Sequence, residues 1–180
     1  MLNNKLLTFA TVSLACSTVA MGGVFAWEKL SNQSKLSINS LGGVTVGMTI
    51  SQASKAAGIR LITQPFDPSC YYIKPQGQPK DVSFMMTGEG RIARIDIDNK
   101  SITTIRGAKI GDTEARIKSL YPGQIKVKQH EYLKDGHYLV FVPSDRADQN
   151  YRVVFETDGK RVIRMRSGKL PEVEYVEGCA

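Results

Sequence analysis

Two stretches of the chain share one pattern, in which a pair of apolar, strand-like runs flanks a short polar turn. The runs and their turns lie at residues 82–86, 87–90 and 92–95, and again at residues 153–156, 157–160 and 162–165. The second turn contains Asp158-Gly159, and Asp-Gly between two apolar runs is a strong hairpin signal. The pattern therefore predicts two antiparallel hairpins.

A second pattern precedes each hairpin and predicts a short helix. The residues from Leu41 to Ala53 match those from Ile105 to Ile117, with Gly47 aligned to Gly111 and Thr49 to Thr113. Threonine at such a position caps the free N–H groups of a helix, and Gln52 completes a capping box with Thr49. We expect the helices to end at Gly58 and Gly123, because glycine adopts the conformation that closes a helix.

Further strands are expected around these elements, at residues 70–74, 125–133 and 137–142. The combined pattern predicts an α+β protein of two tandem repeats, each a short helix packed on a three- to four-stranded antiparallel sheet. We place the first repeat at residues 41–100 and the second at 101–180.

The segment Val44-Thr45-Val46-Gly47-Met48-Thr49, followed by Ala53 and present in two copies, resembles a known pattern. It is similar to the helix starts of the tandem helix-plus-sheet fold of β-lactamase inhibitory proteins and of small SmpA/OmlA-like envelope proteins. The resemblance implies a protein-binding module of the bacterial cell envelope rather than an enzyme. It assigns no contact residues. The chain also differs from these inhibitors in its cysteines, because the inhibitors have a disulfide within each repeat.

The N-terminus has the features of an export signal. Lys5 is followed by an uncharged stretch from Leu6 to Trp27, and Val24-Phe25-Ala26 fits a cleavage site. Residues 1–26 are therefore predicted to be a signal peptide, with an uncleaved membrane anchor as the alternative. Lipidation at Cys16 is disfavoured because the preceding residues do not form a regular lipobox. Residues 27–40 are expected to be a polar tether.

Export changes how the cysteines and the charge are interpreted. Cys70 and Cys179 remain after cleavage, and in an oxidising compartment an even pair favours a disulfide over two free thiols. The chain carries 24 basic and 17 acidic side chains, a formal net charge of +7, and only Lys5 is lost with the signal. Outside the cell membrane, a basic chain favours acidic protein, glycan or lipid headgroups over nucleic acid, and of these we expect a protein partner. Membrane contact is expected only through the N-terminal segment, if it is uncleaved.

Few residues suggest chemistry. His130, Glu131, Asp135 and His137 surround one turn, but the two histidines fall on opposite faces of the predicted hairpin, beside repulsive lysines. Gly47 and Gly111 are explained by their positions just before the starts of the two helices. No phosphate-binding or nucleophile-elbow motif is present. We therefore predict no catalytic residue, cofactor or metal.

Alternation along the last strands predicts a basic surface. Lys126 and Lys128 point away from Ile125 and Val127. In the last hairpin, Ile163 and Met165 are expected to point inward, and Arg164 and Arg166 to share the outer face. If these strands are neighbours, one face carries the candidate partner-binding residues Lys126, Lys128, Tyr132, Arg164 and Arg166. The alternative is an ordinary solvated sheet face. The function predicted is an exported, non-enzymatic protein-binding module, with an anchored envelope assembly or scaffold component second and a hydrolase third.

Overall fold

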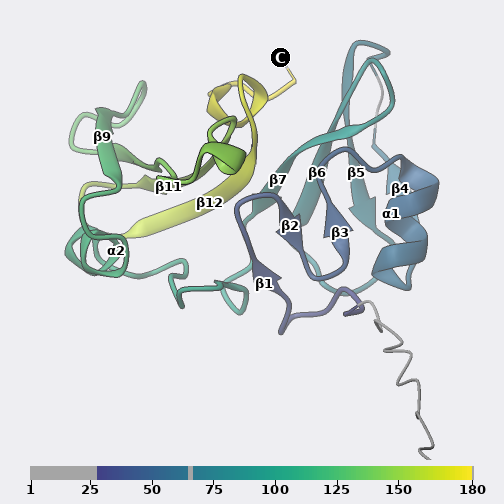
Figure 1. Ribbon diagram of the computed structural model, residues 1–180, viewed down its shortest axis with the longest axis horizontal. Helices are drawn as coiled ribbons and strands as arrows, with labels where there is room; N and C mark the ends of the chain where they lie inside the picture. Colours follow the sequence, from purple (N-terminus) through teal and green to yellow (C-terminus); the bar gives the residue numbers. More distant parts are fainter. Residues whose placement is uncertain (1–27, 65–66, 180) are drawn as a thin grey trace, which may run out of the picture.

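The computed structural model describes residues 28–64 and 67–179 and shows an α+β fold. Two helices accompany an eight-stranded sheet and a smaller four-stranded sheet, as Figure 1 shows. The predicted signal peptide at residues 1–26 lies outside the described residues.

The large sheet is antiparallel throughout, and its strands run in the order β4-β5-β6-β7-β12-β11-β10-β9. Its strands are β4 (Leu61–Thr63), β5 (Cys70–Pro75), β6 (Val82–Thr87), β7 (Ile92–Ile97), β9 (Ile125–Gln129), β10 (His137–Phe141), β11 (Tyr151–Thr157) and β12 (Val162–Lys169). Both predicted hairpins are present, as β6–β7 and β11–β12. The strand predicted at residues 125–133 ends at Gln129, because the chain turns over residues 130–136.

The two halves of the chain meet in the middle of this sheet, where β7 pairs with β12. The predicted arrangement of a separate sheet for each half is therefore wrong. One continuous apolar core runs beneath the sheet, with Phe84 and Ile95 from the first half and Phe155 and Met165 from the second, all fully buried.

The small sheet closes the N-terminal side of this core. It consists of β1 (Lys35–Leu36), β2 (Ser40–Leu41), β3 (Val44–Thr45) and β8 (Thr103–Thr104). Its strand order is β3-β2-β1-β8, in which β1 and β8 are parallel. The expectation of a polar tether at residues 27–40 is wrong over residues 28–40. Leu30 and Leu36 are buried in the core, and the chain between them is therefore part of the folded structure.

The helix α1 (Ile50–Ala57) has the predicted ends. Thr49 accepts a hydrogen bond from the Gln52 backbone N–H, and the Gln52 side chain accepts one from Thr49 in return, so the capping box is confirmed. Gly58 closes the helix with φ of 68°.

The helix α2 (Glu114–Leu120) begins at Thr113 as predicted but does not end at Gly123. Its last helical residue is Leu120, because Pro122 disfavours helical geometry in the residue before it. Tyr121 accordingly has φ of −129° and ψ of 62°, and its ring is buried in the core.

The same contact holds the start of each helix to a strand of its own half. The Gly47 N–H donates to the Ile92 carbonyl at 2.7 Å, and the Gly111 N–H donates to the Val162 carbonyl at 2.8 Å. Arg91 and Arg161 donate back to the carbonyls of these two glycines, at 2.9 and 2.7 Å. Both glycines have positive φ, 92° and 94°, which explains why glycine stands there.

A disulfide joins Cys70, at the start of β5, to Cys179 near the C-terminus, as the sequence predicted. It closes a loop with a sequence separation of 109 residues. Such a link stabilises a protein mainly by restricting its unfolded chain.

We expect the double variant Cys70→Ser/Cys179→Ser to lose about 4–5 kcal/mol of unfolding free energy, since the unfolded chain regains that freedom. Urea denaturation of the variant and the wild type measures the difference, and reduced wild type provides a second reference. A loss below about 1 kcal/mol would contradict the assignment of this stability to loop closure.

Glu114 connects α2 to the large sheet and should make stability depend on pH. Its carboxylate accepts hydrogen bonds from the Thr157 hydroxyl at 2.6 Å and contacts His137 Nδ1 at 2.8 Å. Burial by itself raises the pKa of Glu114, but these hydrogen bonds and the nearby positive charge outweigh it, so the pKa lies below its ordinary value of 4.5.

A carboxyl group whose pKa is lowered by folding stabilises the protein at pH values above its ordinary pKa. This stabilisation disappears as the pH falls through the folded-state pKa. We therefore expect the stability difference between wild type and Glu114→Gln to be larger at pH 7 than at pH 3. Urea titrations at the two pH values measure it, and Glu89→Gln, in the exposed β6–β7 turn, is the control. A difference independent of pH would rule out this role of Glu114.

Candidate partner-binding surface

The face of the large sheet opposite the main core carries alternating charged and apolar side chains. Cross-strand pairing places Lys128, Tyr138, Glu156 and Arg164 in one row, and Lys126, Val140, Val154, Arg166 and Asp96 in the next. The last ten described residues, 170–179, cross this face, and we call them the strap. The sheet face beneath and beside them is called the strap face.

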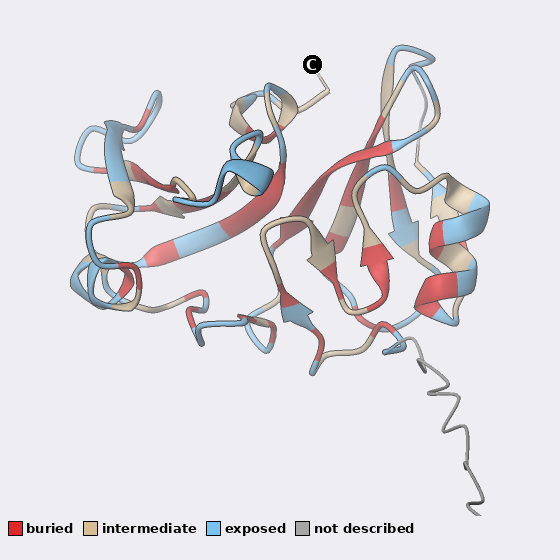
Figure 2. Ribbon diagram, in the orientation of Figure 1, coloured by how far each residue is buried: buried red, intermediate tan, exposed pale blue. Residues whose placement is uncertain are grey.

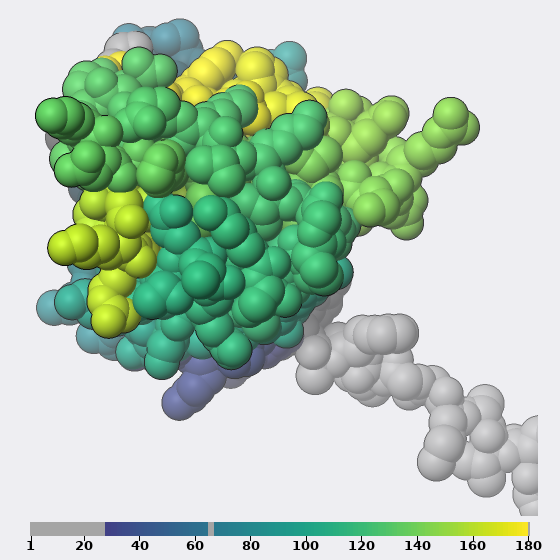
Figure 3. All heavy atoms as spheres, turned by 90° about the vertical axis from the view of Figure 1, so that its left-hand side faces the viewer, coloured from purple at the N-terminus to yellow at the C-terminus, as the bar shows by residue number. Residues whose placement is uncertain are grey.

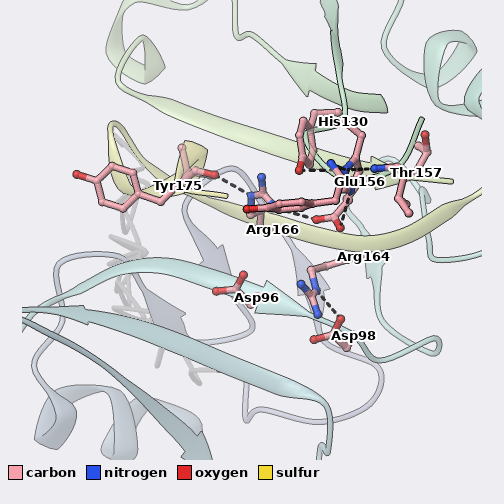
Figure 4. A network of polar contacts seen from close by, with 12 residues as sticks. Asp96, Asp98, His130, Glu156, Thr157, Arg164, Arg166 and Tyr175 are labelled. Carbon is pink, nitrogen blue, oxygen red and sulfur yellow. Dashed lines mark hydrogen bonds and ion pairs between the residues drawn. The ribbon is translucent and has the colours of Figure 1, made fainter. Parts of the chain in front are cut away.

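Two buried arginines hold the backbone of the strap. Arg94 Nη1 donates to the carbonyl oxygens of Tyr175 at 2.7 Å and Glu172 at 3.2 Å. Arg166 Nε donates to the carbonyl of Val173 at 2.9 Å. In Figure 4 the backbone of Tyr175 lies beside Arg166. The strap thus satisfies its carbonyl groups with side chains instead of a strand ladder.

Apolar contacts fix the strap at the same point. Val173, in a short 3₁₀ helix at Glu172–Glu174, is fully buried against Tyr138, Val140 and Val154. These four residues form a second apolar cluster, separate from the main core. The strap therefore covers apolar surface that the sheet would otherwise expose.

A charged network lies under the strap around Glu156. Arg166 Nη1 donates to Glu156 Oε2 at 3.0 Å, and His130 Nε2 lies 3.1 Å from Glu156 Oε1. The backbone N–H of Tyr132 donates to His130 Nδ1 at 3.0 Å, so Nε2 is the nitrogen that carries the proton toward Glu156. Burial lowers the pKa of Arg166, and the charge of Arg94 adds to this effect, while Glu156 opposes it.

Two further ion pairs differ in their exposure. Arg94 and Asp96 form a buried pair at 2.7 Å, while Arg164 and Asp98 form a half-exposed pair at the same distance. The hydrogen bond to Asp98 raises the pKa of Arg164, and partial burial opposes this shift. The strap face is consequently less basic than the sequence suggested, because carboxylates accompany most of its cations.

The structure separates the five predicted partner-binding residues into two groups. Lys126, Lys128, Tyr132 and Arg164 reach solvent, with Tyr132 67% exposed and Lys128 paired with Glu174 of the strap at 2.9 Å. Arg166 is only 2% exposed, so its assignment to an exposed surface is wrong. The strap covers Arg166, whose guanidinium donates hydrogen bonds to the Val173 carbonyl and the Glu156 carboxylate.

The expected inward position of Ile163 is also wrong. The ladder between β11 and β12 shifts register at Glu156/Thr157, which leaves Ile163 without a partner between Val162 and Arg164. Its side chain is 40% exposed, while Met165 is buried as expected. A bulge of this kind displaces side chains from strict alternation.

Open grooves lie on both sides of the strap. One, of about 300 Å³, is lined by Tyr72, Lys74, Ser83, Asp98, Arg164 and Glu177 among others. The other, of about 140 Å³, lies next to Lys128, Glu131 and Tyr138. Exposed Tyr175, on the strap, and exposed Tyr132, beside His130, add aromatic surface to this face.

The two histidines do not meet. His130 contacts Glu156 on the strap face, whereas His137 contacts Glu114 of α2 on the other side of the sheet. Within residues 28–64 and 67–179, no group of three or more metal-ligating side chains comes together.

Sequence reasoning missed Arg94, Asp96 and Asp98, which form much of the strap face. The signal was present, because Arg94 and Asp96 alternate with Ile95 and Ile97 in a strand otherwise made of apolar residues. Two opposite charges at alternate positions of an apolar strand indicate a face that is buried and paired.

A separate hollow beside α1 was also not expected. It has a volume of about 710 Å³ and lies between the loop that enters α1 and the helix itself, with Val46, Met48 and Ala56 as its apolar wall and Lys55 and Arg91 at its rim.

Comparisons with known proteins show little similarity. No protein-family model matches the chain, and no curated protein matches it significantly. The uncharacterized protein YfeY from Escherichia coli has a solved structure that matches 78% of this chain and 99% of its own, with 17% identity and a TM-score of 0.45. An extracellular protein containing an SCP domain from Bacillus anthracis matches 77% of this chain and 50% of its own, with 10% identity and a TM-score of 0.46.

The disulfide between Cys70 and Cys179 is typical of proteins that fold outside the reducing cytosol. In the part of the chain that the structure describes, neither helix has the length and apolar character needed to cross a membrane.

We expect Arg166→Met to lose about 3–5 kcal/mol of unfolding free energy, because it leaves the Glu156 carboxylate and the Val173 carbonyl without their buried donor. The matched variant Arg164→Met, two residues away on the same strand and half-exposed, should lose at most about 1 kcal/mol. Urea denaturation distinguishes the two. Equal losses would contradict the burial of Arg166 beneath the strap.

Proposed function

We propose that the chain is an exported, non-enzymatic protein-binding module that recognises an acidic protein partner through the exposed part of the strap face. The observation that carries this proposal is the composition of that surface. Tyr132 and Tyr175 are exposed on it, and tyrosine is enriched at binding hot spots. Exposed Lys126 adds positive charge to the same surface.

The rigidity of the surface supports the same function. The strap is fixed at one end by its continuity with β12 and at the other by the disulfide, and Arg94 and Arg166 hold it between. A surface that is ordered before binding loses little conformational entropy when a partner arrives. The charge pattern favours a partner with carboxylates, because the ammonium group of Lys126 has no ion-pair or hydrogen-bond partner among the described residues.

We also interpret the two halves as copies of one helix-plus-sheet unit. The equivalent contacts of Gly47 and Gly111, and the connection of each helix to four following antiparallel strands, support this duplication. A duplicated unit that doubles the width of a sheet provides a face large enough for a protein partner.

The test is capture of partners from the native envelope fraction by the full chain. We expect Lys126→Glu combined with Tyr132→Ala to reduce capture at least tenfold, since both side chains are exposed and contribute little to folding. The matched control combines Lys55→Glu with Ile105→Ala, which changes an exposed lysine and an exposed large apolar residue elsewhere.

Equal capture by both double variants would overturn the proposed binding surface. The intact mass of the native chain separates the alternatives: loss of residues 1–26 supports an exported module, and their retention supports the anchored scaffold component.

A further inference from the structure

The outer edge of β9 is open. β9 is the last strand of the large sheet, and no other strand described by the structure pairs with its outer side. Four of its five residues are exposed, and Figure 2 shows most of it in the colour of exposed residues. In Figure 3, which faces the β9 side of the molecule, the green surface of this region lies toward the viewer.

The register identifies the backbone groups at this edge. The His130 N–H donates to the Gly136 carbonyl at 3.0 Å, and the Val142 N–H donates to the Gln124 carbonyl at 2.9 Å. Hydrogen-bonded pairs alternate along an antiparallel ladder, so Lys126 and Lys128 also turn their N–H and C=O groups toward β10. The N–H and C=O groups of Ile125, Val127 and Gln129 therefore point outward.

The side chains at this edge specify the chemistry of a strand added beside it. Lys126 and Lys128 lie on the strap face, while Val127, 49% exposed, lies on the opposite face. Because side chains alternate along a strand, an added strand would place every second residue beside the lysines and the others beside Val127. Acidic residues fit the first set and apolar residues the second.

The chain itself contains a segment of this composition on the same face. The strap sequence Glu172-Val173-Glu174-Tyr175-Val176-Glu177 mixes acidic and apolar residues. Val173 is buried, and Glu174 forms the ion pair with Lys128. This basic end of the strap face is therefore complementary to an acidic, apolar peptide. The ammonium group of Lys126, next to it, forms no ion pair within the described chain.

A second copy of the chain does not fit the same edge. Two β9 strands paired antiparallel about Val127 would set Lys126 of each copy opposite Lys128 of the other. Like charges in directly opposed positions destabilise a strand pair, which is how edge lysines prevent self-association. The same lysines favour a strand of opposite charge.

We infer that the β9 edge binds an extended peptide segment of alternating acidic and apolar residues, which adds a ninth strand to the sheet through Ile125, Val127 and Gln129. This inference rests on the proposed binding function and specifies its partner. The carboxylates of the added strand lie beside Lys126 and Lys128, and its apolar residues cover Val127.

The experiment mixes the full exported chain with a fluorescent synthetic peptide that alternates Glu and Val. The fluorescence anisotropy of the peptide measures its binding. Val127→Pro removes an outward N–H and leaves the β9–β10 ladder intact, because proline is tolerated at the open side of an edge strand. We expect binding to weaken about tenfold or more, the effect of roughly 1.4 kcal/mol. The control Val127→Ala keeps the N–H group and should bind within about threefold of wild type.

A second measurement uses the unaltered protein and does not depend on how the proline variant folds. Two versions of the peptide are N-methylated on alternate amides, one on every Glu amide and the other on every Val amide. Only one of them keeps the N–H groups that face β9 when its carboxylates lie beside the lysines. A slip by one residue would exchange the two faces and does not rescue the other version. We expect one version to bind like the parent peptide and the other to lose binding.

Equal binding of the two methylated peptides, or Val127→Pro binding like wild type, would overturn strand addition and leave only charge attraction. Absence of binding by the parent peptide would overturn the inference as well. These failures are distinguishable from failure of the proposed function, because capture of the native partner can still depend on Lys126 and Tyr132 when strand addition does not occur.

Discussion

The pairing of β7 with β12 joins the first and second halves of the chain at the centre of one sheet. Met165 lies opposite Ile97 and Arg166 opposite Asp96, so this one register aligns the apolar core on one face and the charged network on the other. Residues far apart in the sequence thereby share one core, and neither half has to be stable with only its own few strands. The strap can cross the sheet only because the two halves form a single surface.

Local signals in the sequence were sufficient for the elements made of neighbouring residues. The capping box of Thr49 and Gln52 and the Asp158-Gly159 turn are formed by residues close in sequence, and the sequence predicts them correctly. The pairing of Cys70 with Cys179 was predicted because removal of the predicted signal peptide would leave only these two cysteines.

Apart from the disulfide, the features that depend on contacts between distant residues were not predicted. Nothing local to Arg166 indicates that the strap covers it, and the polar composition of residues 28–40 hides Leu30 and Leu36, which pack into a core assembled elsewhere. The bulge that exposes Ile163 depends on the partner strand. The charge of the predicted surface was overestimated because Asp96, Asp98 and Glu156 lie on strands next to its arginines and pair with them.

The way the strap is held has a consequence for sequence change. Arg94 and Arg166 donate to the backbone carbonyls of Glu172, Val173 and Tyr175, and every amino acid provides a carbonyl. Only Val173 has a side chain that the sheet fully encloses. The outward residues of the strap can consequently vary without loss of its path. The protein thus has a scaffolded display segment, closed by a disulfide, on which new surface chemistry can be selected or engineered.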